Sequence, residues 1–541
     1  MPAKFIFMTG GVCSGLGKGI TAASLGRLLK ARGFKVSIQK FDPYLNMHPG
    51  LLSPYQHGEV YVTEDGAEVD LDLGHYERFI DENLTADDSV SAGRIYWEVL
   101  NKELQGAYKG ATIQVIPHIT DAIKSRIYKA SKHLNTDIII SEIGGTVGDI
   151  ESLPFLEAIR QASHDLGYEN VMYVHVTLVP FLSFADEMKS KPTQRSVKDL
   201  LSLGIKPDAL VCRTEKPLTD EIREKLALFC NVDKASVIEN QNVDRIYEVP
   251  LLLEEERLAD IVCKRLGLNP PPPDLSEWCR LVEKSKNLKA EVNIGLVGKY
   301  IEFKDSYLSV VEAMMHAGIF HNAKVNLKWI HAEEINDKNA ASHLDGMDGV
   351  LVPGGYGDRG VAGLISAVGY AREKGIPFFG IGLGMQCALI EFARSVMNLP
   401  DADTTEINKN TKSPIVRRIN TICTETNDET TAKISEMRLG AFPINLAHGT
   451  IIHEAYGESQ INERFRHLYK INNDYRKGFA AKGIVESALS PDNENMEAFE
   501  LTRATHPWFL GVQFHPEFKS RLTKPGPLFK AFVGACLDYK P

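Results

Sequence analysis

Short apolar segments alternate with amphipathic segments along most of the chain. Residues 4–8, 137–140, 292–297 and 377–381 are apolar runs of strand length, whereas residues 21–32 repeat apolar side chains at helical spacing. Strands that are separated by helices predict parallel sheets with helices on both faces. The pattern therefore predicts an α/β protein built from doubly wound parallel sheets.

A proline-rich segment divides this pattern into two halves. Residues 270–273 are consecutive prolines, which neither a helix interior nor a central strand accommodates. A short helix over residues 275–282 and a lysine-rich stretch then lead into the next predicted strand. We predict domains over residues 1–267 and 291–541, joined by a linker over residues 268–290.

A glycine-rich turn follows the first strand. From Thr9 to Lys18 the chain reads Thr-Gly-Gly-Val-Cys-Ser-Gly-Leu-Gly-Lys. Glycines let successive N–H groups face a triphosphate, the following helix adds positive potential, and Lys18 adds a charge. A strict Walker A motif has Gly at position 12 and Ser or Thr at position 19, where this chain has Val12 and Gly19. Because the hydroxyl ligand for magnesium is missing, carboxylates from elsewhere are expected to hold the ion.

Acidic residues that qualify as magnesium ligands lie in two places. Asp70 and Asp72 stand close together, and Glu142 follows the strand predicted over residues 137–140. Most acidic residues in proteins simply face solvent. The carboxyl end of a strand, however, is where open α/β sheets bind their ligands, which favours Glu142.

A second motif has the form of a nucleophile elbow without a nucleophile. Residues 378–386 read Phe-Phe-Gly-Ile-Gly-Leu-Gly-Met-Gln, and helical spacing continues over residues 385–393. Gly382 occupies the position that presents the reactive side chain. The pattern alone fits a plain tight turn equally well, but His515 and Glu517 supply the base and the carboxylate of a Cys-His-Glu triad.

Together these residues resemble a class I glutamine amidotransferase domain, whose elbow reads Gly-Ile-Cys-Leu-Gly-Met-Gln. The resemblance implies that His515 and Glu517 are the remainder of a catalytic triad. It also implies a vestigial glutamine site formed by Gly354, Gly355, Leu383, Gln386 and Glu406.

Six further blocks extend a resemblance over the whole chain. In order, residues 40–44, 56–60, 70–76, 114–118, 142–160 and 189–194 are similar to the CTP synthase family. That family joins a P-loop amidoligase domain of the dethiobiotin-synthetase-like type to a class I glutamine amidotransferase domain. The resemblance implies a ligase that uses ATP and Mg²⁺ to phosphorylate O4 of UTP, after which ammonia displaces phosphate to give CTP.

The same resemblance assigns residues of the first domain. Lys18 and Lys40 are implied to be catalytic, because lysines and magnesium meet the charge on a transferring phosphoryl group. Asp72 and Glu142 are the implied magnesium ligands, and His57 is the implied gate for ammonia, although a lone histidine beside a glycine is more often an ordinary loop residue. The implied ATP site is Ser14, Gly15, Leu16, Gly17, Lys18, Gly19, Lys40 and Asp72, and the implied UTP and CTP site is Ser14, Asp149, Ile150, Glu151, Lys189, Ser190, Lys191, Pro192, Thr193, Gln194 and Lys225.

Two departures from the family accompany Gly382. Over residues 466–470 the family's Arg-His-Arg-Tyr-Glu becomes Arg-His-Leu-Tyr-Lys, so Leu468 replaces an arginine that helps to hold the glutamine carboxylate. The family's Gly-Gly-Thr before Met437 becomes Ile-Ser-Glu over residues 434–436. A laboratory change would alter the nucleophile alone, so natural loss of glutaminase activity is favoured over an engineered variant. Losing the nucleophile of a triad removes on the order of 10⁶ in turnover, so free ammonia is the expected nitrogen source.

Two other functions stay open at this stage. A non-catalytic partner of an active paralogue would have no need of Lys18, Lys40, Asp72 and Glu142, all of which are present. A related P-loop amidoligase acting on a carboxylic acid would leave residues 189–194 unexplained. The resemblance further implies a homotetramer that can form filaments and feedback inhibition by CTP, and it leaves GTP binding undecided.

Composition describes the setting of this chemistry. The 541 residues are 43% hydrophobic and 24% charged, which is ordinary for a large soluble protein. A formal net charge of −10, without a basic stripe, argues against nucleic-acid binding. No apolar run is long enough to span a membrane, and the phosphate loop begins too near Met1 for a signal peptide, so a cytoplasmic enzyme is expected.

Two local features complete the sequence-based predictions. The eight cysteines are scattered without disulfide or metal spacing, which predicts free thiols in a reducing compartment. Cys387 lies inside the predicted helix after the elbow and is expected to be a packed apolar residue. Residues 408–435 are polar and weakly patterned, which predicts a loop.

Overall fold

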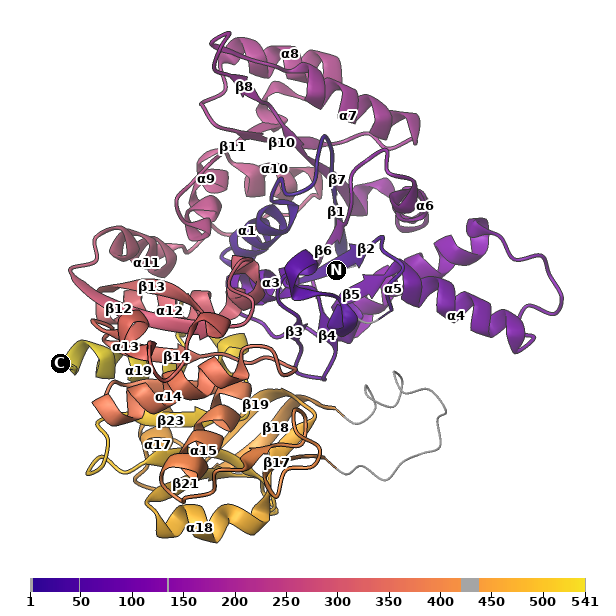
Figure 1. The fold of residues 1–541 in the computed structure, drawn as a ribbon. Coiled ribbons are helices and arrows are strands. Elements are labelled where there is room, and N and C mark those ends of the chain that lie inside the picture. Colours follow the sequence, from indigo (N-terminus) through magenta and orange to yellow (C-terminus); the bar gives the residue numbers. More distant parts are fainter. Residues whose placement is uncertain (1–2, 48, 134–135, 420–436, 541) are drawn as a thin grey trace. The chain divides into compact units, whose positions relative to one another are not determined.

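The described part of the chain forms two compact units. The computed structural model describes residues 3–47, 49–133, 136–419 and 437–540 (Figure 1). The first unit comprises residues 1–49 and 72–282, and the second comprises residues 50–71 and 283–541. Residues 50–71, which the sequence analysis placed inside the first domain, therefore group with the second unit.

The first unit is built on a seven-stranded sheet in which every pair of neighbouring strands is parallel. The strands β2 (Val36–Asp42) and β6 (Ile138–Ile143) are buried at every position, as expected for a sheet covered on both faces. In spatial order the strands are β11 (Val237–Gln241), β10 (Ala209–Thr214), β7 (Val171–Leu178), β1 (Lys4–Gly10), β6 (Ile138–Ile143), β2 (Val36–Asp42) and β5 (Ser89–Ser91).

Alternate side chains of these strands point to opposite faces. Phe5 and Phe7 of β1 join a core cluster with Ile123 of α5 (Thr120–His133) and Phe155 of α6 (Leu153–Leu166). On the other side of the sheet, Gly26 of α1 (Lys18–Lys30) lies against Ile38 of β2. The helices are α1 (Lys18–Lys30), α3 (Asp72–Ile80), α4 (Ala92–Leu104), α5 (Thr120–His133), α6 (Leu153–Leu166), α7 (Lys191–Ser202), α8 (Asp220–Cys230), α9 (Val249–Glu255) and α10 (Leu258–Arg265), with the small hairpin β8 (Phe181–Leu182) and β9 (Glu187–Met188).

The second unit contains a nine-stranded sheet that is only partly parallel. Strands β13 (Ala323–His331), β12 (Ala290–Gly298), β14 (Gly349–Val352), β15 (Phe378–Ile381) and β23 (Phe509–Val512) are parallel. They are followed by β22 (Met496–Leu501), β21 (Ile484–Leu489), β18 (Arg438–Leu446) and β19 (Gln460–His467), which run antiparallel. The α/β class with parallel sheets is confirmed, and the second sheet adds four antiparallel strands that the sequence analysis did not predict, since close antiparallel neighbours need no crossover helix.

Helices cover the two faces of the parallel part of this sheet. Phe378 packs toward α14 (Val361–Lys374) and α15 (Leu383–Ser395), whereas Phe379 packs toward α12 (Leu308–His321) and α19 (Pro527–Asp538). Burying one such phenylalanine contributes about 1.5–3 kcal/mol. The helices of the second unit are α2 (Pro54–His57), α12 (Leu308–His321), α13 (Ala340–Leu344), α14 (Val361–Lys374), α15 (Leu383–Ser395), α17 (Ile451–Tyr456), α18 (Arg476–Ala481) and α19 (Pro527–Asp538).

Several predicted boundaries change in the structure. The helix predicted over residues 275–282 is α11 (Ser276–Lys286). The loop predicted over residues 408–435 contains a strand, β17 (Ser413–Arg418), which pairs with β16 (Ala402–Thr404) and β20 (Tyr469–Ile471). Cross-strand backbone bonds that sequence pattern does not reveal form this strand, and residues 420–436, with Cys423, lie outside the described part.

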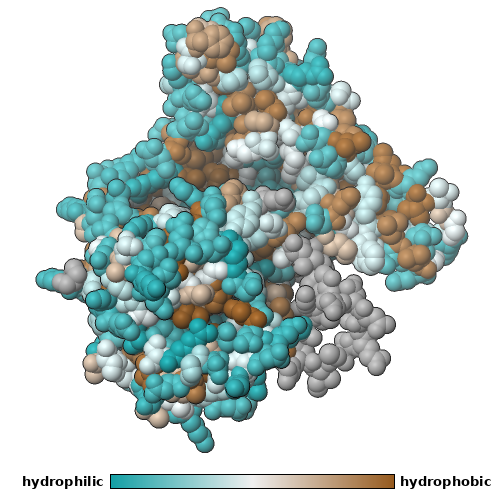
Figure 2. Space-filling view, in the orientation of Figure 1, coloured by the Kyte–Doolittle hydropathy of each residue, from teal (hydrophilic) through white to brown (hydrophobic). Residues whose placement is uncertain are grey.

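Most of the visible surface is polar, with scattered apolar groups (Figure 2). One such group lies over α4, where Trp97 and Leu104 are 55% and 80% exposed. Within the described residues, no helix is both long enough and apolar enough to cross a membrane.

Candidate functional site

The glycine-rich turn of the first unit joins β1 to α1, as the sequence predicts. Gly15 and Gly17 have positive φ, and so does Val12, whose φ of 89° is unusual for a β-branched residue. Helix α1 begins at Lys18. The Lys18 ammonium donates to the Gly145 carbonyl at 2.8 Å, and burial lowers the pKa of Lys18.

Lys40 stands between the two predicted magnesium ligands. Strand pairing sets Lys40 of β2 beside Glu142 of β6, and the ammonium lies 3.1 Å from Glu142 Oε1. Lys40 also forms an ion pair with Asp72, the first residue of α3. Burial alone would lower the pKa of Lys40, but the carboxylates of Asp72 and Glu142 raise it well above its ordinary value. Glu142 lies within β6 rather than after it, because the strand extends to Ile143.

The absence of a side chain at Gly19 makes room for these carboxylates. A Cβ atom at Gly19 would lie 2.6 Å from Asp72 Oδ1 and 3.3 Å from Glu142 Oε2. Two carboxylates beside a phosphate loop match the oxygen ligands that magnesium prefers, so the residues present fit the ion. Asp70 belongs to the segment that groups with the second unit.

Sequence reasoning missed two members of this cluster. The Tyr76 hydroxyl donates to Glu142 Oε2, and Asp42 Oδ1 lies 3.9 Å from the Lys40 ammonium. Tyr76 is one helical turn after Asp72, so helical spacing could have placed both on one face of α3. Asp42 ends β2, where the carboxyl-end rule applies.

The predicted UTP residues follow the carboxyl ends of other strands. Residues 189–194 lead into α7 after β7, Asp149–Glu151 follow β6, and Lys225 is an exposed residue of α8. Lys189 pairs with Glu187, and Asp149 Oδ2 accepts from the Thr146 N–H at 2.8 Å. The described contacts do not join Lys225 to the phosphate loop.

A buried histidine nevertheless ties α7 to the phosphate loop. His175 Nδ1 lies 2.9 Å from Thr9 Oγ1, and His175 Nε2 lies 2.8 Å from Ser196 Oγ of α7. Ser196 comes so close to the loop that a Cβ at Gly11 would overlap its hydroxyl. The sequence offers no signal for this link, because His175 lies inside an apolar strand.

The second unit holds a cavity of about 380 Å³ that contains the predicted elbow and triad residues. Its lining residues all belong to residues 50–71 and 283–541, so it is a site of this unit alone. The predicted members that line it are Gly354, Gly355, Gly382, Leu383, Gln386, Glu406, His515 and Glu517.

The elbow keeps its strained shape although it has no reactive atom. Gly382 has φ 54° and ψ −106° between β15 and α15. The flanking glycines are required by close packing, because a Cβ at Gly384 would lie 2.1 Å from the Val352 carbonyl oxygen. A Cβ at Gly382 would lie 3.6 Å from His515 Nε2, an ordinary contact distance. The position therefore still faces the base.

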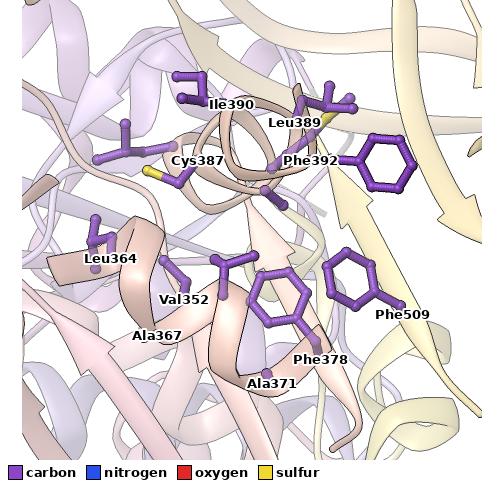
Figure 3. Close-up of a cluster of buried hydrophobic side chains, with 14 of the residues drawn as sticks. Val352, Leu364, Ala367, Ala371, Phe378, Cys387, Leu389, Ile390, Phe392 and Phe509 are labelled. Carbon is purple, nitrogen blue, oxygen red and sulfur yellow. The ribbon is translucent and has the colours of Figure 1, made fainter. Parts of the chain in front are cut away.

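The two other residues predicted for the triad are in contact with each other. His515 Nδ1 lies 2.7 Å from Glu517 Oε1, and both side chains are buried. Cys387 does not replace the missing nucleophile: it packs among apolar residues such as Val352 and Leu364, and burial raises its pKa to about 12 (Figure 3). This confirms the prediction that Cys387 is a packed residue.

Leu468, which stands where the resemblance places an arginine, lies between β19 and β20 and lines the cavity. Arg466 on β19 also lines the cavity and forms an ion pair with Glu68 at 2.8 Å.

The other predicted residues of this unit lie outside the cavity wall or outside the described part. His57, the predicted ammonia gate, ends α2 and is exposed. The substituted residues 434–436 lie outside the described part.

Comparison with known proteins assigns each half of the chain to a protein family. The family described as CTP synthase N-terminus matches residues 4–268, and that described as glutamine amidotransferase class-I matches residues 302–535. A CTP synthase of Ruminiclostridium cellulolyticum is 56% identical over 540 residues, covering 100% of both chains. The chain belongs to the CTP synthase family.

Further matches have the same name. A CTP synthase of Caldanaerobacter subterraneus subsp. tengcongensis is 57% identical over 538 residues, covering 99% of each chain. The glutaminase domain of a Trypanosoma brucei CTPS, solved with bound acivicin, is 32% identical with a TM-score of 0.42 and covers 46% of this chain and 95% of that one. As a member of this family the chain is a ligase that forms a C–N bond, the ATP-dependent amination of UTP to CTP, and the family depends on ATP and magnesium in general.

Proposed function

We propose that this CTP synthase takes its nitrogen from free ammonia and that its amidotransferase unit does not hydrolyse glutamine. The observation that carries the proposal is Gly382 at the elbow position, facing His515 without a side chain. Leu468 supports it, because an apolar side chain lines the cavity where the resemblance places a carboxylate-binding arginine. Without a thiol, the His515–Glu517 pair has no proton to take from a nucleophile.

In the first unit, we propose that the phosphate loop and two lysines do the chemistry of UTP activation. Loop N–H groups and Lys18 hold the ATP phosphates, and Lys40 compensates negative charge on the transferring phosphoryl group. Asp72 and Glu142 would hold Mg²⁺, which supplies further charge neutralisation when bound. Asp149, Glu151, Lys189, Gln194 and Lys225 are proposed to bind UTP, and the retained pyrimidine site supports feedback inhibition by CTP.

The ammonia gate is proposed from the family resemblance. We propose that His57 fills this role, and its exposed position at the end of α2 is compatible with it.

The oligomeric state and the location are also part of the proposal. The exposed apolar side chains of α4 support self-association, as in a homotetramer. The scattered cysteines support a cytoplasmic location.

The test compares nitrogen sources in the purified full-length chain. With UTP, ATP and magnesium, ammonium should give CTP, whereas glutamine freed of ammonia should give product at background. A chain inactive with both sources would favour a non-catalytic partner subunit. Glutamine-driven CTP synthesis in the absence of free ammonia would overturn the proposal.

A further inference from the structure

The cavity of the second unit is lined by more acidic than basic side chains. Among its described lining residues the acidic side chains are Glu59, Glu68, Glu406 and Glu517, and the one lysine or arginine is Arg466. Arg466 already pairs with Glu68 at 2.8 Å, and its guanidinium lies 5.0 Å from the Tyr356 ring centroid. A ligand carboxylate would therefore enter without a cation to meet it, which is costly in a buried site.

The Glu406 carboxylate is suited instead to a positively charged group of a ligand. Its Oε1 accepts from the Gly357 N–H at 2.8 Å. Burial raises the pKa of Glu406, although this hydrogen bond and the charge of Lys299 act in the opposite direction. The Lys299 ammonium donates to the carbonyls of Tyr356 and Gly357 at 3.1 and 2.5 Å, and it forms no ion pair with Glu406 in the described structure. A bound ammonium group would therefore give Glu406 a direct ion-pair partner.

Tyrosine side chains line the same cavity as Glu406. These are Tyr356 and Tyr469, along with Tyr300 and Tyr307. A cavity that combines a carboxylate with tyrosine rings suits an ammonium group, because the ring faces attract cations as well. Apolar side chains, including Leu383, Met437 and Leu468, form other parts of the wall.

Other lining residues of the cavity can accept hydrogen bonds. With the Nδ1–H of His515 directed at Glu517, His515 Nε2 is left as an acceptor facing the space over Gly382. Gln386 Nε2 donates to Gln513 Oε1 at 3.3 Å, so these two lining residues add further polar groups to the cavity. An amide or amine N–H is the complementary group.

We propose that this cavity binds small primary amines that lack a carboxylate, with the ammonium on Glu406, the apolar body against Leu468, and an N–H group directed at His515. The site has changed its selectivity from an amino acid to a simple cationic amine. This inference deepens the proposed function, because it concerns the same cavity that lacks the thiol.

A matched pair of ligands isolates the carboxylate. Glutamine and 4-aminobutanamide share the ammonium and the amide arm and differ only in the carboxylate. Calorimetric titration of the full chain should give a dissociation constant for 4-aminobutanamide about 10- to 100-fold lower than that for glutamine, the range expected when a charged partner is missing. Equal or tighter binding of glutamine, or no binding of the amine, overturns the inference.

Variants identify the contacts. Glu406→Gln should weaken amine binding about 10-fold or more, whereas Glu373→Gln, which removes an exposed charge outside the cavity, should leave it unchanged. Leu468→Arg should reverse the preference in favour of glutamine, and its thermal unfolding would show that it folds. Amine binding that persists in Glu406→Gln overturns the assignment.

The two proposals fail in distinguishable ways. A chain that hydrolyses glutamine refutes the ammonia-dependent function, whatever it binds. A chain that makes CTP only from ammonium but binds neither ligand refutes the amine site alone.

Discussion

The two units place polar side chains at the carboxyl ends of parallel strands, and they differ in what has been kept there. In the first unit Lys40 meets Asp72 and Glu142, so each buried charge of this cluster has an opposite charge beside it. In the second unit His515 and Glu517 still face Gly382, where nothing can react.

On the proposed function, the shape of the second site has outlasted its chemistry. The elbow is fixed by backbone packing, such as the approach of Gly384 to the Val352 carbonyl and the Gly382 N–H bond to Val512 at 2.7 Å. None of these contacts involves a thiol. The turn therefore does not need a thiol to keep its shape, which is compatible with the proposed loss of the nucleophile.

The largest expected effect would come from restoring the second unit. Gly382→Cys combined with Leu468→Arg should raise glutamine-dependent CTP formation by on the order of 10³ or more, part of the ~10⁶ that a nucleophile supplies. The thiol would stand within reach of His515, since a Cβ there lies 3.6 Å from Nε2. Mass spectrometry with glutamine should detect a glutamyl thioester. Gly382→Ala is the control, and a folded double variant without thioester would contradict the elbow geometry.

Removing a proposed catalytic lysine from the first unit should have the next largest effect on the rate of CTP synthesis. Lys18→Met removes the ammonium that donates to Gly145 and should lower the rate of ammonium-dependent CTP synthesis by about 10²–10³-fold. Lys35→Met, at an exposed position of the same unit, is the matched control and should leave the rate near wild type. Unchanged turnover in Lys18→Met would show that Lys18 has no catalytic role.

Gly19→Ala tests whether activity depends on the space that Gly19 leaves for the carboxylates, because its effect on kcat can be measured apart from its effect on Tm. The new methyl group would press on Asp72 Oδ1, and misplacement of this kind should lower kcat by about 10- to 100-fold. Alanine is favoured over glycine in a helix by up to about 1 kcal/mol, so Tm should not fall on that account. Gly26→Ala in the same helix presses on Ile80 and Ile38 instead and should lower Tm while the folded fraction keeps its activity. Equal effects of both variants on kcat would contradict the carboxylate explanation.

The smallest effect concerns a buried carboxyl of the second unit with no opposite charge at ion-pair distance in the described structure. Burial raises the pKa of Glu463 to about 7, and Tyr456 donates to it at 2.7 Å. Between its unfolded and folded pKa values the folded state holds the extra proton, so the free energy of unfolding falls as pH rises from about 4.5 to 7, by on the order of 1–3 kcal/mol.

Glu463→Gln, which has no proton to lose, should therefore flatten the decline of Tm between pH 5 and pH 8. Glu373→Gln, at an exposed site, should keep the wild-type slope. Thermal unfolding followed across this range measures both, and parallel curves for wild type and Glu463→Gln would show that this group does not control the slope.

Local patterns were enough to predict many elements, within limits. The strand predicted over residues 4–8 is β1, and the helix after the elbow is α15, because apolar periodicity reports directly on burial. The antiparallel half of the second sheet was not predicted, since strand direction depends on which distant strands pair. The same is true of β17, which lies in a polar stretch.

The sequence by itself determined the chemistry: which residues can carry charge, where Gly382 leaves a nucleophile out, and which family the motifs resemble. Only the tertiary structure decided the neighbours, such as Tyr76 beside Glu142, His175 between Thr9 and Ser196, and residues 50–71 in the wall of the second unit's cavity. The reason is physical. A side chain's chemistry is fixed by its covalent structure, whereas its partners, burial and pKa depend on long-range packing that no short stretch of sequence records.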